Sequence, residues 1–252
     1  MLTHLSLFSG IGGLDLAAEA AGFTTVGQCE WADFPTKVLE KHWPDVPRWR
    51  DIHGLSADDF IRRTGCKEVT VVSGGFPCQP HSVAGKRKAS DDDRDLWPEM
   101  RRVISEIKPR WVVAENVPGL LSSENGRFFG RVLRDFAALG FDVGWGITSA
   151  AAIGAIHRRE RMAIVAHARG IGFPGGVQKE ERHDSNEQSE RVLADILRKV
   201  DENYLRQRAV LGISNGVPNR VDRSKALGNA VVPQQFYPFF KAIHDIETGG
   251  IQ

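Results

Sequence analysis

Hydrophobic and polar positions alternate along the first two thirds of the chain in two different rhythms. Short runs rich in β-branched and aromatic residues predict strands, and apolar residues at three- and four-residue spacing predict helices between them. The expected strands are 4–8, 24–29, 69–73, 111–115, 141–149 and 162–167. Helical spacing is found in Leu14, Ala17, Ala18 and Ala21, and again in Phe129, Val132, Leu133 and Phe136. Strands and helices in alternation favour an α/β fold with a mostly parallel, doubly wound sheet.

The pattern changes after residue 167. The turn-rich GIGFPGG and the polar QKEERHDSNEQSE offer little to bury and predict a linker or mobile loop. One apolar helical stripe follows, made by Leu193, Ile196, Leu197 and Val200. Another is made near the end by Phe236, Phe239, Phe240 and Ile243. We expect the helix that carries this last stripe to dock back on the sheet, because its apolar face needs a partner.

Composition narrows the class of protein. A chain of 252 residues with 41% hydrophobic content can form one sizeable α/β domain with a small appendage. Lys and Arg number 33 against 32 for Asp and Glu, so any affinity for a polyanion must come from local basic patches. The cysteines Cys29, Cys66 and Cys78 suggest neither a disulfide framework nor a metal site. No stretch approaches the ~18 apolar residues of a membrane span, and we expect a soluble, unprocessed protein in a reducing cytoplasm without membrane contact.

A glycine-rich turn, Phe8-Ser9-Gly10-Ile11-Gly12-Gly13-Leu14, follows the first expected strand and opens a helix. Its exposed backbone N–H groups permit close approach of a ligand, although a tight turn alone would explain it equally well and the pattern GxGxxG is not matched. Glu30 and Trp31 follow the second strand, where a carboxylate can accept ribose hydroxyls and an indole can stack on adenine. Asp51 and Ile52, expected at the end of a third strand, offer an acceptor for an adenine amino group and an apolar contact. A solvated loop acid is the alternative for Asp51.

The sequence Gly-Gly-Phe-Pro-Cys-Gln-Pro places Cys78 on a stiff turn at the carboxyl edge of the sheet, where open α/β sheets bind substrates. A thiolate is both a strong nucleophile and a good leaving group, although a lone cysteine is more often inert. Glu115 ends another expected strand and should lie on the same rim. Arg159 and Arg161 alternate just before the strand 162–167 and can point into one cleft, where they would hold a carbonyl or a phosphate. A solvated basic face is the alternative for these arginines.

Taken in order, these segments resemble the motifs of the cytosine-C5 DNA methyltransferase family, especially its short phage-encoded members. The segments are FSGIGGLDLA, EW, DI, GGFPCQPHSVAGKRK, DRDLWPEMRR, ENVPG, HRRERMAIV and KALGNAVVPQ, and they span both ends of the chain. The resemblance implies a Rossmann-like class I methyltransferase fold, S-adenosyl-L-methionine as cofactor and double-stranded DNA as partner. It also implies DNA methylation in restriction-modification or in phage biology, in a bacterial or phage-infected cytoplasm.

The resemblance also implies a role for each matching residue. Cys78 would attack C6 of a cytosine flipped out of the duplex, Glu115 would hold N3 and N4, and Arg159 and Arg161 would bind the phosphate and the base carbonyl. The cofactor pocket would be lined by Phe8, Gly10, Gly13, Leu14, Glu30, Trp31, Asp51, Ile52, Pro77, Leu96, Asn229 and Val231. The stretch 81–94 would be a loop that closes over DNA, with its basic residues on phosphates. These basic residues are Lys86, Arg87 and Lys88.

The same resemblance suggests a division into three parts. Residues 1–167 would form the cofactor-binding catalytic domain, 168–222 a reduced or degenerate target recognition region and linker, and 223–252 a segment that completes the catalytic domain. Two departures from the family stand out. His157 replaces the usual glutamine, and the short stretch 168–222 holds no copy of a further arginine-containing motif. Because that region reads bases in the major groove, the target sequence is not predicted, and a partner chain that supplies target recognition is a further hypothesis.

Three functions are compatible with these motifs. The favoured one is an active DNA methyltransferase with relaxed or very short target recognition. The second is a catalytically impaired binding or decoy protein on the same fold, and the third is an RNA cytosine-C5 methyltransferase. The intact PCQ and ENV segments argue against the second, and the tail KALGNAVVPQ favours DNA over RNA.

Overall fold

The computed structural model describes residues 1–77, 95–155, 158–170 and 230–249. The residues with predicted roles that lie outside these ranges are Cys78, Lys86, Arg87, Lys88 and Asn229. The apolar stripe within 193–200 and the position of His157 also lie outside them. The roles of these residues therefore stay predictions.

The centre of the molecule is a seven-stranded sheet in the order β3-β2-β1-β4-β5-β7-β6. Its strands are β1 (Thr3–Leu7), β2 (Thr24–Cys29), β3 (Arg48–Trp49), β4 (Val71–Gly74), β5 (Trp111–Asn116), β6 (Phe141–Ser149) and β7 (Glu160–Ala168). The first five strands in this order are parallel, and β7 runs antiparallel between β5 and β6. This sheet confirms the expected α/β class and the mostly parallel arrangement.

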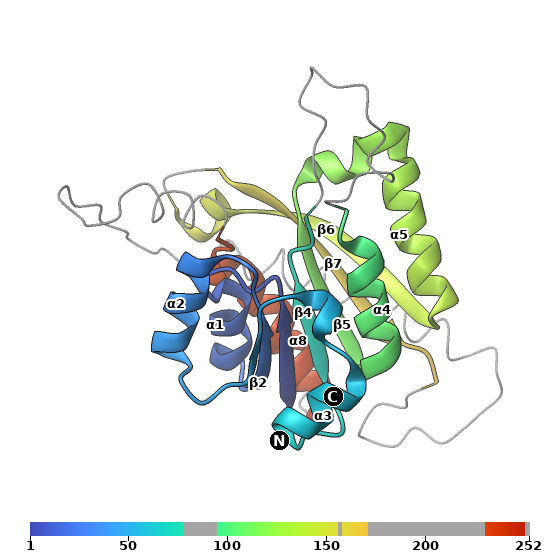
Figure 1. Ribbon diagram of the computed structural model, residues 1–252. Helices are drawn as coiled ribbons and strands as arrows, with labels where there is room; N and C mark the ends of the chain where they lie inside the picture. Colours follow the sequence, from blue (N-terminus) through green and yellow to red (C-terminus); the bar gives the residue numbers. More distant parts are fainter. Residues whose placement is uncertain (78–94, 156–157, 171–229, 250–252) are drawn as a thin grey trace.

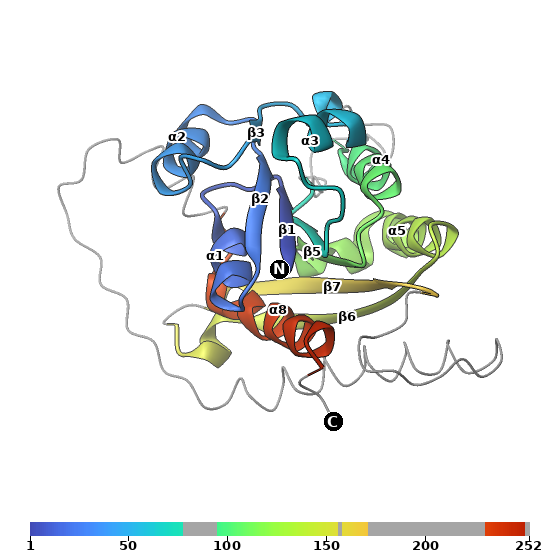
Figure 2. The same ribbon diagram turned by 90° about the horizontal axis from the view of Figure 1, so that it is seen from below.

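Helices cover both faces of the sheet (Figures 1 and 2). They are α1 (Gly13–Ala20), α2 (Asp33–His42), α3 (Ala57–Thr64), α4 (Trp97–Ile107), α5 (Arg127–Ala138) and α8 (Pro233–Glu247), with 3-10 turns η1 (Ile52–Gly54), η3 (Pro118–Gly126) and η4 (Ala150–Ile153). Figure 2 shows α1 and α8 on one side of the sheet and α3, α4 and α5 on the other. Each side has its own apolar cluster, one centred on Phe236 and Phe240 and the other on Trp97 and Phe128. The sheet is therefore doubly wound, as predicted.

All six expected strands are present, with small shifts at their ends. The first strand stops at Leu7, because Phe8 has a left-handed backbone with a φ of 52° that turns the chain out of the sheet. The strand that was expected to end at Asp51 and Ile52 is β3. It ends already at Trp49, so Asp51 lies outside it. Asp51 instead caps the turn η1 by accepting a hydrogen bond from the His53 N–H. This local capping explains why the strand pattern stops before the acidic residue.

The reversed direction of β7 was not predicted, and it decides which residues meet. Opposite β5, Ala163 pairs with Glu115 and Met162 pairs with Asn116. Because β7 is antiparallel, its amino-terminal end lies at the edge where the parallel strands have their carboxyl ends. Arg161 at the start of β7 is thereby brought to the same edge as Glu115.

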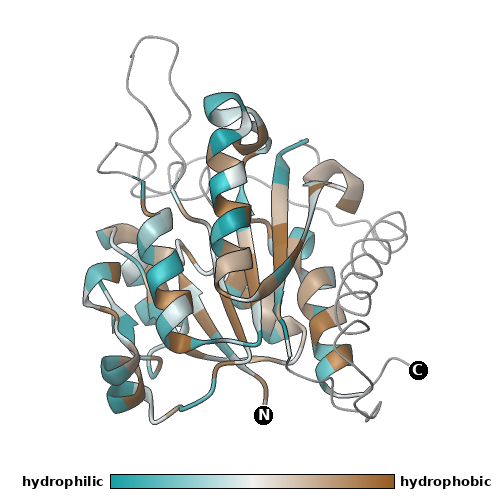
Figure 3. Ribbon diagram, turned by 90° about the vertical axis from the view of Figure 1, so that its right-hand side faces the viewer, coloured by the Kyte–Doolittle hydropathy of each residue, from teal (hydrophilic) through white to brown (hydrophobic). Residues whose placement is uncertain are grey.

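The last helix docks on the sheet as the apolar stripe predicted. Phe236, Phe239, Phe240 and Ile243 are all buried and pack with residues of α1 and of the central strands. In Figure 3 the hydrophobic colour of the helices faces the sheet and the hydrophilic colour faces outward. In the described parts of the chain, no helix has both the length and the apolar character needed to cross a membrane. The three-part division of the chain stays a prediction, because most of 168–222 lies outside the described ranges.

Candidate functional site

The register of the sheet brings some of the predicted site residues, among them Glu30 and Glu115, to one edge. Leu7 pairs with Cys29 on one side and with Gly74 on the other, and Gly74 in turn pairs with Ala114. The residues that follow these four positions are therefore neighbours along the carboxyl edge of the sheet. They are Phe8, Glu30, Gly75 and Glu115. Ligands of open α/β sheets bind at this edge.

The glycine turn after β1 is shaped by contacts within the chain. Gly10 and Gly12 have φ values of 55° and 88°, which L side chains rarely adopt. A Cβ on Gly13 would lie 2.4 Å from the Val231 carbonyl oxygen, so this glycine lets the C-terminal segment pass directly over the start of α1. The structure thus brings Val231 to the glycine turn, and its role in cofactor binding stays a prediction. The Leu14 side chain is buried in the core between α1 and α8.

The Glu30 carboxylate tethers this turn to the second strand. Its Oε2 accepts a hydrogen bond from the Gly10 N–H at 2.8 Å, and its Oε1 accepts one from the Ala32 N–H at 2.8 Å. Each carboxylate oxygen has a second lone pair, so the group keeps capacity for ligand hydroxyls. The side chain of Trp31 beside it is 73% exposed, which leaves its ring accessible for stacking.

The remaining cofactor candidates lie in the turn after β3 and at the two ends of the stretch 78–94. Asp51 Oδ1 accepts hydrogen bonds from His53 N at 3.0 Å and from His53 Nδ1 at 2.7 Å. These contacts, the backbone N–H first, hold the pKa of the Asp51 carboxyl below its usual range. Ile52 is buried, whereas Pro77 and Leu96 are partly exposed.

Glu115 and Arg161 form a buried ion pair at the centre of the edge. Arg161 Nε lies 2.6 Å from Glu115 Oε1, and the two side chains are only 15% and 12% exposed. Burial raises the pKa of the Glu115 carboxyl, while the positive charges of Arg161 and Arg159 act in the opposite direction. Burial therefore favours the protonated carboxyl more than in water, and a protonated carboxyl can both donate and accept hydrogen bonds to a heterocyclic base.

Arg159 is held by the C-terminal segment. Its guanidinium donates to the Ala230 carbonyl, and its own carbonyl accepts a hydrogen bond from Gln235 Nε2 at 3.0 Å. The Arg159 backbone has a φ of 29°, a strained conformation for a residue other than glycine. Burial lowers the pKa of Arg159, and the neighbouring charge of Arg161 acts in the same direction. Gln235 was not among the predicted site residues, although a polar residue on the apolar face of the last helix was a signal for it.

The chain just before Cys78 is fixed against β5. A Cβ on Gly75 would lie 2.8 Å from Glu115 Oε2, so this glycine allows the loop to pass beside the carboxylate. Asn116 Nδ2 donates a hydrogen bond to the Phe76 carbonyl at 3.1 Å. Asn116 belongs to the ENVPG segment, and no role was predicted for it from the sequence. Within the described ranges, His, Cys, Asp and Glu side chains form no group of three or more that could hold a metal ion.

Solved structures define the class of fold. A structure described as a DNA modification methyltransferase encoded within a prophage of E. coli matches with a TM-score of 0.68 at 17% identity, covering 98% of this chain and 100% of that one. Spodoptera frugiperda DNMT2 matches with a TM-score of 0.55 at 20% identity, covering 72% of this chain and 54% of that one. The chain therefore has the Rossmann-like methyltransferase fold, as expected from the motifs.

The sequence places the chain more narrowly. The sequence model of the C-5 cytosine-specific DNA methylase family matches residues 2–225, and the chain belongs to this family. The Type II methyltransferase M.HgiCII of Herpetosiphon aurantiacus is 29% identical over 252 residues, which cover 97% of this chain and 53% of the relative. M.NgoMIV of Neisseria gonorrhoeae is 34% identical over 164 residues, covering 65% of this chain and 51% of the relative. The chain spans about half the length of these curated relatives.

Proposed function

We propose that this protein is a DNA (cytosine-5-)-methyltransferase that uses S-adenosyl-L-methionine and a covalent Cys78 adduct. The observation that carries the proposal is the buried Glu115–Arg161 pair, which lies against the loop that leads directly into Cys78. The glycine turn and Glu30 lie on the same edge of the sheet. Membership of the C-5 cytosine-specific DNA methylase family supports the same reaction.

The residues around the glycine turn fit the proposed cofactor. Gly10 and Gly12 leave the turn without side chains, Glu30 offers carboxylate oxygens for ribose hydroxyls, and Asp51 offers an acceptor for the adenine amino group. Trp31 adds an exposed indole for stacking. When bound, S-adenosyl-L-methionine supplies an electrophilic methyl group. Phe8, Gly13, Leu14, Ile52, Pro77, Leu96, Asn229 and Val231 complete the proposed pocket.

The proposed role of Cys78 is to make and later break one bond to the base. The thiolate adds to C6 of the flipped cytosine, and the electron pair of the C5–C6 bond moves toward C5. Glu115 hydrogen-bonds N3 and N4 and stabilises the charge that the addition pushes into the ring. Arg161 and Arg159 hold the base carbonyl and the neighbouring phosphate. After C5 has been methylated, the C5 proton leaves to a base and the C6–S bond breaks, which returns the electron pair to sulfur.

Duplex DNA is the proposed partner. Lys86, Arg87 and Lys88 are assigned to backbone phosphates, which fix the position of the protein on DNA without reading its sequence. Residues 1–167 together with 223–252 are proposed as the catalytic domain. The stretch 168–222 is proposed as a reduced target recognition region, to which a partner chain would add contacts.

The test is a transfer assay with labelled S-adenosylmethionine and either duplex DNA or tRNA, followed by mapping of the methylated positions. We expect label on C5 of cytosine in DNA. Label only in tRNA would support the RNA reaction instead, and no transfer to either would support a protein that only binds.

A second assay tests the nucleophile. Duplex DNA with 5-fluorocytosine should trap a covalent adduct, because the fluorine cannot leave as a proton does. Cys78→Ser should form no adduct, whereas the exchange of another cysteine, Cys66→Ser, should leave trapping unchanged. Equal trapping by Cys78→Ser and wild type would show that the nucleophile is misassigned.

A further inference from the structure

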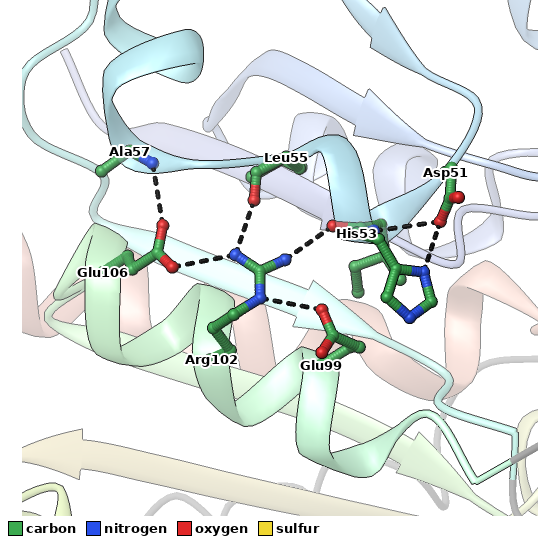
Figure 4. A network of polar contacts seen from close by, with 8 residues as sticks. Asp51, His53, Leu55, Ala57, Glu99, Arg102 and Glu106 are labelled. Carbon is green, nitrogen blue, oxygen red and sulfur yellow. Dashed lines mark hydrogen bonds and ion pairs between the residues drawn. The ribbon is translucent and has the colours of Figure 1, made fainter. Parts of the chain in front are cut away.

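Arg102, in the second turn of α4, donates hydrogen bonds both to the short turn η1 and to two carboxylates of its own helix. Its Nη2 donates to the Ile52 carbonyl at 2.8 Å, and its Nη1 donates to the Leu55 carbonyl at 3.0 Å (Figure 4). On its own helix, Nε donates to Glu99 Oε2 at 2.8 Å and Nη1 to Glu106 Oε1 at 2.9 Å. Two carboxylates thus orient a planar group that bridges two backbone carbonyls.

Glu106 adds another link between the same two elements. Its Oε2 accepts a hydrogen bond from the Ala57 N–H at 3.1 Å, at the start of α3. Inside the turn, the backbone makes only short-range bonds, from the Gly54 N–H to the Asp51 carbonyl at 3.2 Å and from the Leu55 N–H to the Ile52 carbonyl at 3.1 Å. The bonds from α4 therefore connect the backbone of this turn to the rest of the fold, beside the packing of the buried Ile52 and Leu55 side chains in the core.

The turn that Arg102 holds is the one assigned to the adenine end of the cofactor site. Ile52 is the proposed apolar contact for the adenine, and its carbonyl accepts the shorter of the two Arg102 hydrogen bonds to this turn. Asp51, the residue before it, is the proposed acceptor for the adenine amino group. Leu96, also assigned to the pocket, is the residue that caps the start of α4. The helix α4 and its N-cap therefore carry both a proposed pocket residue and the side chain that holds the turn with Ile52.

We propose that Arg102 is a positioning residue for cofactor binding, which sets the place of Asp51 and Ile52 without touching the ligand. This inference rests on the proposed function, because it requires that the turn binds the adenosine part of S-adenosylmethionine. A lysine cannot replace the arginine, since a single ammonium group cannot span two carbonyls and two carboxylates in one plane. Loss of one hydrogen bond to a charged group corresponds to about a tenfold change in affinity.

The neighbouring Arg101 provides a matched control. Its Nε lies 3.4 Å from Asp135 Oδ1, so it faces α5 and makes none of the bonds to the turn. Calorimetric titration with S-adenosylhomocysteine should give a dissociation constant about tenfold higher for Arg102→Lys than for wild type. Arg101→Lys should bind as wild type does. The melting temperature of each variant, measured without ligand, identifies a general loss of folding.

A double-mutant cycle separates positioning from general stabilisation. If Arg102 acts through the turn, Arg102→Lys should weaken binding less in an Asp51→Ala background than in wild type, since the contact it positions is already lost. Additive losses, or equal weakening by Arg101→Lys, would overturn the inference. Should Arg102→Lys fail to fold, Glu99→Gln tests the same point by removing one carboxylate that orients the guanidinium, and unchanged binding would overturn the inference.

Wild-type binding separates the two proposals. If wild type does not bind S-adenosylhomocysteine, the proposed function fails and the role of Arg102 fails with it. If wild type binds and Arg102→Lys binds equally well, only the role of Arg102 is wrong.

Discussion

The carboxyl of Glu115 lies between two opposing influences. Burial favours its neutral form and raises the pKa, while Arg161 at 2.6 Å favours the charged form. Such a balance lets a carboxyl donate a hydrogen bond in one state and accept one in another. Glu115 can thus serve a base whose N3 accepts and whose N4 donates.

Glu115→Gln is expected to slow methyl transfer by about 10²-fold, because the amide cannot share a proton with N3 and leaves the buried Arg161 without its charged partner. The measurement is the single-turnover rate with labelled S-adenosylmethionine and duplex DNA. Glu160→Gln, an exposed neighbour at the start of β7, is the control and should keep the wild-type rate. A Glu115→Gln rate within twofold of wild type would contradict the assignment.

At the scale of single residues, the sequence predicted which residues lie at strand ends better than which side chains contact one another. Glu115 was expected on one rim with Cys78, and Arg161 was expected to point into a cleft with Arg159. The structure pairs the Glu115 and Arg161 side chains. The bond from Asn116 to the Phe76 carbonyl was not expected, since it joins residues 40 positions apart through a side chain. Bonds of this kind depend on which strands are neighbours, and a single sequence does not give strand order.

Among the described elements, α8 joins parts of the chain that are distant in sequence. Its apolar face packs on α1 and the sheet, and Gln235 at its start is fully buried and donates to the carbonyls of Thr148 and Arg159. One helix thereby fixes the end of β6 to the residue before β7. It connects the last described segment of the chain to the arginines of the candidate site.

Gln235→Ala is expected to lower methyl transfer about tenfold, because it removes buried donors from the Arg159 and Thr148 carbonyls and loosens the strained Arg159 backbone. Cofactor affinity should change little, since Gln235 does not contact the glycine turn in the bonds described above. Transfer should be measured well below the melting temperature of the variant. A loss of cofactor affinity equal to the loss of transfer would argue against this role.

At the scale of elements, only part of the arrangement could be predicted from the sequence. Apolar periodicity located the strands and the docking face of α8, because both depend on which side chains are buried. It could not give the antiparallel direction of β7, since the pattern of one strand is the same in either direction. The meeting of Arg161 and Glu115 depends on that direction.

For the whole molecule, two buried ionisable groups connect stability to pH. The His4 side chain on β1 links this strand to both of its neighbours. Its Nδ1 lies 3.2 Å from Thr25 Oγ1 on β2, and its Nε2 lies 2.7 Å from Ser73 Oγ on β4. Burial lowers its pKa to about 3 from 6.5. Asp15, hydrogen-bonded to Ser6 and Gln28, has a pKa raised by burial to about 6 from 3.8.

These shifts have opposite signs. As the pH falls from 6.5 toward 3, His4 gains a proton in the unfolded chain but not in the folded one, so its contribution destabilises the fold. As the pH falls from 6 toward 3.8, Asp15 gains its proton first in the folded chain, so its contribution stabilises the fold. The two contributions partly cancel in mildly acidic solution.

His4→Gln should therefore remove the destabilising contribution and leave that of Asp15. Its free energy of unfolding should fall less on acidification from pH 6.5 to 4.5 than that of wild type. Denaturant titrations across this window measure the slope, which is independent of any constant loss of stability. His42→Gln, an exchange of an exposed histidine, should keep the wild-type slope, and an unchanged slope in His4→Gln would show that His4 is not the group responsible.

The contact between Val231 and Gly13 has a consequence for the order of events during translation. The helix α8 is the last described element to leave the ribosome, yet it is the element that covers α1, one of the first. Until residues 230–247 emerge, the nascent chain displays the bare flank of α1 and an open glycine turn. The start of α1 therefore reaches its final packing only once α8 has docked and brought Val231 over Gly13.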